Sequence, residues 1–145
     1  MANEQDLLGS WLVSYLEGDS TLMGMLNGGI MPEVVEKTLA DPLVRVDFLD
    51  GSDVYVIGLT RVWLDATYHV RGCVHWQGTG QPDRTEVNAI GAQLDVLLHN
   101  HEAATASLQV HSFREEPTPS PAQFEQNGEL WLQSGGVYRI RAHAL

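Results

Sequence analysis

The stretch VWLDATYHVRGCVHW, residues 62–76, carries the clearest strand pattern of the chain. Successive side chains of a strand point to opposite faces, so its alternation predicts one apolar face and one mixed face. A hydrophobic core needs only the apolar face. The mixed face carries Trp63, Asp65, His69, Arg71 and His75, and we interpret it as a surface that contacts another molecule.

Length and composition suit one soluble globular domain over residues 1–145, large enough to bury a core without disulfides. The single cysteine, Cys73, excludes an intramolecular bridge. No apolar run is long enough to span a membrane, and the start MANEQDLLGS lacks the basic residues of a signal peptide. The formal net charge of −11 disfavours a protein that grips duplex DNA.

Three helices are predicted from apolar residues at helical spacing, at 6–17, 19–26 and 84–99. Asp19 or Ser20 should cap the second helix, and Asp83 the third, with Glu86 completing a capping box. Strands are predicted at 42–50, 54–60, 62–76, 106–112 and 129–142, the last broken at Gly135-Gly136.

The connections follow from turn-forming residues. We expect a turn at 50–53, loops at 78–83 and 115–126, an extended link at 30–32 and a bulge or strand end near Ser112. Antiparallel strands around one long helix indicate an α+β fold. Its antiparallel or mixed sheet should carry the helices on one face.

We expect no catalytic, metal or cofactor site. His99-Asn100-His101-Glu102 is a dense group of potential metal ligands, but it lacks the spacing that puts two histidines on one helix face. His69 and His75 share a strand face without an evident nucleophile. Cys73 is interpreted as a small buried residue, and Gly78-Thr79-Gly80 matches no phosphate-binding loop.

Two further features are candidate contact sites. Arg139 and Arg141 share a strand face, where they could meet an acidic partner or pair with the chain's own carboxylates. The predicted loop at 115–126 suits a docking surface, for which the candidate residues are Glu115, Glu116, Pro117, Pro119 and Phe124.

The layout resembles the tail terminator, or tail completion, proteins of long-tailed bacteriophages. Residues 6–33, DLLGSWLVSYLEGDSTLMGMLNGGIMPE, are similar to the amphipathic helix, short D-x-x-L helix and glycine turn that open that family. Residues 110–142 are similar to its ending, a charged strand end, a proline-containing loop and a Gly-Gly-x-Tyr-x-Ile strand. The helix after the longest strand also falls in the expected place.

This resemblance implies a structural virion protein without catalytic residues, which assembles in the cytoplasm of the host bacterium. It would form a homo-oligomeric, hexameric ring at the head-proximal end of the tail, stop polymerisation of the major tail tube protein and join the head–tail connector. DNA would traverse the lumen without specific binding, which suits an acidic chain. No membrane partner is expected.

Other functions stay open on the sequence. A head-side connector or stopper subunit of the neck would show the same features. A small α+β enzyme or ligand-binding domain would need polar residues on its buried face, but the helical stripes are nearly pure apolar. An adaptor or inhibitor acting as a monomer would not self-associate.

Overall fold

A computed structural model describes residues 4–32, 41–55, 61–76, 83–104, 108–118, 123–126 and 129–144. Its elements follow in chain order: α1 (Glu4–Glu17), α2 (Ser20–Gly24), β1 (Gly29–Pro32), β2 (Leu43–Tyr55), β3 (Arg61–Trp76), α3 (Thr85–Leu98), β4 (His101–Ala104), β5 (Leu108–Pro117), β6 (Gln123–Gln126) and β7 (Glu129–Ala144).

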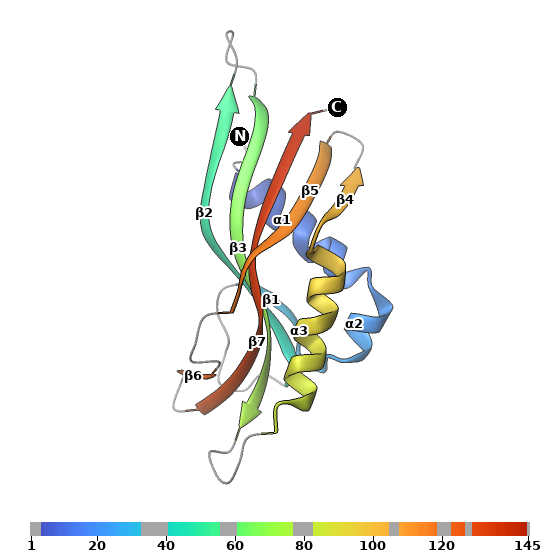
Figure 1. Cartoon of the computed structure of the whole chain (residues 1–145), viewed down its shortest axis with the longest axis vertical. Helices are drawn as coiled ribbons and strands as arrows, with labels where there is room; N and C mark the ends of the chain where they lie inside the picture. Colours follow the sequence, from blue (N-terminus) through green and yellow to red (C-terminus); the bar gives the residue numbers. More distant parts are fainter. Residues whose placement is uncertain are drawn as a thin grey trace.

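In the part of the chain that the structure describes, seven strands form one sheet (Figure 1). Its order is β1-β2-β3-β7-β5-β4, and β6 pairs with β7 beyond the end of β5. β1 runs parallel to β2 and all other pairs are antiparallel, so the sheet is mixed. The long strand predicted at 62–76 is confirmed as β3, the neighbour of β2 and β7.

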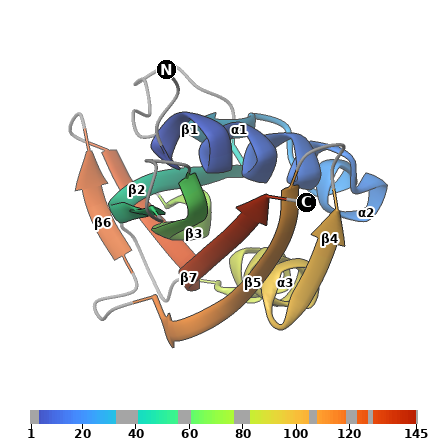
Figure 2. The same ribbon diagram turned by 90° about the horizontal axis from the view of Figure 1, so that it is seen from above.

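The helices cover one face of this curled sheet, as the α+β prediction expected (Figure 2). Tyr68 on β3 lies beside Gly9 of α1, and Gly72 on the same strand face lies beside Ile90 of α3. The core beneath the helices consists of Leu8, Leu12, Leu16, Leu22, Val44, Val46, Ala66, Tyr68, Val70, Ile90, Leu94, Leu98, Val110, Tyr138, Ile140 and Ala142. These residues follow the predicted periods of two in strands and 3.6 in helices.

Small residues let α3 approach the sheet. A Cβ at Gly72 would lie 2.4 Å from Ile90 Cγ2, and one at Gly91 would lie 2.3 Å from Ser134 Oγ. Polar contacts then fix the C-terminal half of the helix. Tyr15 and Ser112 donate hydrogen bonds to the carbonyls of Leu97 and Leu98 respectively, and Tyr138 donates to Asp95.

The turn predicted at 50–53 is wrong, because β2 continues to Tyr55 along β3. Asp50 to Asp53 pair with Thr67 to Leu64 in the ladder. Leu49 is the extra residue of a β-bulge between Phe48 and Asp50, which bends the strand without ending it. A long partner strand therefore overrides the local turn preference of Asp-Gly-Ser-Asp.

The helix ends also differ from the predictions. α1 begins at Glu4 and α2 ends at Gly24. Asp19 is confirmed as the N-cap of α2, whereas the N-cap of α3 is Arg84 and Asp83 accepts a hydrogen bond from the amide of Thr85.

Two segments that we took for non-strand structure lie in strands. The predicted extended link at 30–32 belongs to β1, because its backbone pairs with β2. His101 and Glu102, which follow the predicted end of the helix at 99 and lie in no predicted strand, open β4. The left-handed conformation of Asn100, with φ 52°, turns the chain from α3 into that strand.

The predicted loop at 115–126 is wrong at both ends. β5 continues to Pro117 and β6 begins at Gln123. The register shift in β5 lies between Arg114 and Glu116 rather than near Ser112, because Ser112 stays in the ladder and faces α3. The predicted break in β7 is also absent, since both glycines at 135–136 remain paired.

Several predicted features lie outside the described residues: the end of the strand at 54–60, most of the loop at 78–83, the start of the strand at 106 and Pro119. Backbone positions are described for Trp63 and Phe124, but not their side chains. Within the described ranges, no helix combines the length and apolar character needed to cross a bilayer.

Candidate interface on the outer sheet face

The face of β2, β3 and β7 that points away from the helices, here called the outer face, carries the predicted contact residues. It holds Arg45, Asp47, Asp65, His69, Arg71, Arg139 and Arg141 at alternate strand positions. Their neighbours Val46, Tyr68 and Ile140 point into the core. The predicted division of β3 into an apolar and a mixed face is therefore confirmed.

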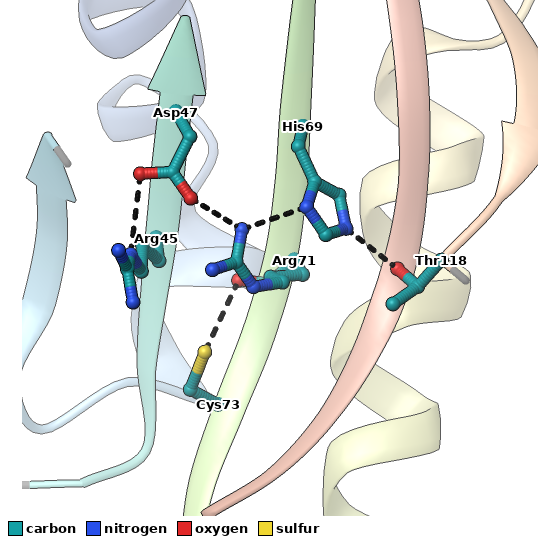
Figure 3. Close-up of polar contacts among 6 residues, drawn as sticks. All are labelled: Arg45, Asp47, His69, Arg71, Cys73 and Thr118. Atoms are coloured by element: carbon teal, nitrogen blue, oxygen red, sulfur yellow. Dashed lines mark hydrogen bonds and ion pairs between the residues drawn. The ribbon is translucent and has the colours of Figure 1, made fainter. Parts of the chain in front are cut away.

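One group on this face is the Arg71 network, made of Arg45, Asp47, His69, Arg71 and Thr118 (Figure 3). The Asp47 carboxylate accepts from Arg71 Nη1 at 2.6 Å and from Arg45 Nε at 3.2 Å. The Arg71 side chain is only 7% exposed and that of Asp47 is 19% exposed. A buried guanidinium is costly without an opposite charge, so the Asp47 carboxylate offsets the cost of burying Arg71.

His69 completes the network in its neutral form. Arg71 Nη1 lies 2.9 Å from His69 Nδ1, and a guanidinium can only donate, so Nδ1 must be the acceptor. The proton then sits on Nε2, which donates to Thr118 Oγ1 at 3.2 Å. Burial, reinforced by the charge of Arg71, lowers the pKa of His69 to about 4.

The second group is the Asp65 cluster, made of Asp65, Glu115, Arg139 and Arg141. Arg139 Nη1 donates to both carboxylate oxygens of Asp65, at 3.1 and 3.2 Å, while its Nε donates to Glu115. Arg141 Nε lies 3.5 Å from Asp65. The two arginines thus pair with the chain's own carboxylates, one of the two possibilities that the sequence left open.

The outer face becomes apolar near the start of β2. Leu43, Cys73 and Trp131 form a second buried cluster there, and His75 packs edge-on against Trp131. Burial raises the pKa of the Cys73 thiol to about 12, so the thiolate needed for nucleophilic chemistry is disfavoured. Cys73 is a buried free thiol, as the sequence predicted.

The histidine-rich group after α3 gains a third histidine in the structure. His111 Nε2 lies 3.4 Å from Asn100 Oδ1, and Glu102 pairs with His111 across β4 and β5. His99 Nδ1 accepts from the amide of Arg114. Among the described residues, no three potential ligands are arranged to hold a metal ion.

The predicted contact residues thus fall into two adjoining groups. His69 and Arg71 belong to the Arg71 network, and Asp65, Arg139 and Arg141 to the Asp65 cluster. Glu115 joins the second group. Glu116 and Pro117 end β5 opposite Val137 and Gly136, and the backbone of Phe124 pairs with Trp131.

Sequence reasoning did not single out three members of the site, Arg45, Asp47 and Thr118. Asp47 has an outward position that alternation predicted, but its place opposite His69 depends on the register of β2 against β3. Thr118 carries no signal of its own, since it reaches His69 through the pairing of its amide with the Gly135 carbonyl.

No protein-family model matches the chain, and no curated protein is significantly similar to it.

Proposed function

We propose that this chain is a structural virion protein that closes the head-proximal end of a bacteriophage tail tube as a ring, most simply a hexamer. It would stop growth of the tube and provide the surface to which the head connector binds. The function requires no reactive group in the subunit. It requires two different patches on each copy, because a ring is built from heterologous contacts.

The observation that carries the proposal is the order of the elements. The amphipathic helix α1, the short capped helix α2 and a glycine segment precede most of the sheet. Helix α3 is the next element after the long strand β3, and the last strand, β7, contains Gly135-Gly136-Val137-Tyr138-Arg139-Ile140. This is the order that the resemblance to tail terminators implies. The outer face adds support, because its partly exposed arginines and carboxylates suit a contact surface.

The direct test is tube length. Purified major tail protein of the phage that encodes this chain is allowed to polymerise with and without the chain, and the tubes are measured by electron microscopy. We expect shorter tubes that carry a ring at one end. Unchanged tube lengths, together with no binding of the chain to preformed tubes, would overturn the proposal.

A further inference from the structure

Charge is distributed unevenly between the two layers of the molecule. The three helices α1, α2 and α3 contain no lysine or arginine, and they contain five acidic residues: Glu4, Asp6, Glu17, Glu86 and Asp95. Among the side chains that the structure describes, the outer face on the opposite side of the sheet holds four arginines: Arg45, Arg71, Arg139 and Arg141. The charged residues of the helices themselves are therefore all acidic, whereas the outer face on the opposite side of the sheet carries arginines.

The four arginines differ in how firmly they are held. Arg71 is almost wholly buried against Asp47. Arg139 lies between Asp65 and Glu115. Arg141 is 50% exposed and reaches Asp65 at 3.5 Å, so its guanidinium can donate hydrogen bonds to a second carboxylate, from another molecule, at little cost.

Arginine is also the cation that protein interfaces favour. The chain has seven arginines and one lysine among its eight basic residues. Arginine is enriched and lysine depleted at interfaces, because the planar guanidinium is weakly hydrated and pairs with carboxylates in a fixed geometry.

We propose that copies of this chain associate face to back, the outer face of one copy lying against the acidic helical layer of the next. A second copy is the occupant that the charges favour, since its helices present the exposed carboxylates of Glu17 and Glu86 and contain no lysine or arginine. The contact joins two different surfaces, so it can propagate into a ring. The inference rests on the proposed function and deepens it by naming the two surfaces through which ring subunits meet.

The first experiment compares two charge reversals by light scattering over a wide range of protein concentration. Arg141→Glu places a carboxylate on the outer face. Arg114→Glu is the matched control, because Arg114 is 40% exposed and also lies 3.5 Å from an aspartate, Asp95, on the helical side. We expect R141E to weaken self-association by about tenfold or more, and R114E to leave it unchanged or strengthened.

The second experiment reverses the other surface. Glu17 and Glu86 are both exposed on the helical layer, and the double variant E17K/E86K should also fail to self-associate. Mixed with R141E, it should form alternating hetero-oligomers, because each face-to-back contact between the two variants then joins opposite charges. Circular dichroism of each variant excludes unfolding as the cause.

The outcomes separate this inference from the proposed function. Self-association that R141E and R114E weaken equally would overturn the face-to-back arrangement, as would a mixture that stays monomeric. A wild-type chain that is monomeric at every concentration would overturn it too. In each of these cases the tube-length experiment still decides the proposed function.

Discussion

At the scale of single residues, His69 couples the Arg71 network to pH. Its pKa of about 4 lies below the value near 6.5 of an unfolded chain, so between these values the unfolded state binds a proton that the folded state excludes. Stability therefore falls as the pH drops from about 6.5 to about 4, and this contribution is constant below that range. Protonation would also turn Nδ1 from an acceptor into a donor facing Arg71.

A variant without this titration tests the assignment. In His69→Gln the amide oxygen can still accept from Arg71, but the side chain has no pKa in this range. We expect wild type to lose about 1 to 2 kcal/mol more stability than H69Q between neutral pH and about pH 4, a value reduced for partial exposure. Denaturant unfolding of both proteins at both pH values measures this difference. Equal losses of stability in wild type and H69Q would show that His69 does not take up the proton.

Asp47 should matter more to stability than the more exposed Asp65. Asp47→Asn removes a carboxylate that accepts from Arg71 at 2.6 Å, which leaves a nearly buried guanidinium beside a neutral amide. We expect a loss of about 2 to 3 kcal/mol in the free energy of unfolding. The matched change Asp65→Asn, facing arginines that are far more exposed, should cost about 1 kcal/mol or less. Equal losses in urea unfolding would show that Arg71 does not depend on Asp47.

At the scale of elements, the approach of α3 to β7 depends on Gly91. In Gly91→Ala the new Cβ would meet Ser134 Oγ at 2.3 Å and the Ser134 backbone at 3.1 Å, so helix or strand must shift. We expect a loss of about 1 to 3 kcal/mol despite the better helix propensity of alanine.

Gly24→Ala is the matched control for Gly91→Ala. It also replaces a helical glycine, but its Cβ would meet nothing within 4 Å. It should raise stability by up to about 1 kcal/mol. Thermal unfolding of both variants measures the change in stability. A G91A variant more stable than wild type would show that α3 and β7 can accommodate a methyl group at this contact.

Periodicity predicted the parts of the fold that face the core. The alternation around Tyr68 and Val70 and the helical stripe of Ile90 and Leu94 gave the right elements and the right inward faces. The predictions were wrong where pairing with a neighbouring strand, rather than the local sequence, determines the backbone conformation. Gly51 stays in a strand because β3 continues opposite it.

The hairpin between β6 and β7 did carry a local signal. Gln126 pairs with Glu129, and the intervening dipeptide in the sequence is Asn127-Gly128, which is typical of two-residue hairpins. The three prolines before it favoured a loop interpretation and obscured this pattern.

For the candidate site, the sequence predicted which side chains share a face of one strand, but not which residues lie opposite each other on neighbouring strands. Alternation placed Asp65, His69 and Arg71 on one face of β3, and Arg139 and Arg141 on one face of β7. It could not give the register that sets Asp65 opposite Arg141, because sliding either strand by two residues preserves both faces.

At the scale of the whole molecule, net charge and local charge favour opposite behaviour towards DNA. The outer face offers arginines, whereas the chain as a whole carries a net charge of −11. A phosphate could bind Arg139 only by displacing Asp65 or Glu115, and it would approach through the repulsive field of the remaining carboxylates.

We therefore expect no binding of duplex DNA at about 0.15 M salt, where charges still interact across roughly 8 Å. Fluorescence anisotropy of a labelled duplex, titrated with the wild-type chain, measures this. The double variant Asp65→Asn/Glu115→Gln serves as a sensitised control, because it frees Arg139 and Arg141 from their carboxylates. Binding by wild type that weakens steeply with salt would show that phosphates can displace the internal pairs, and that the arginines of the outer face are open to DNA as well as to protein.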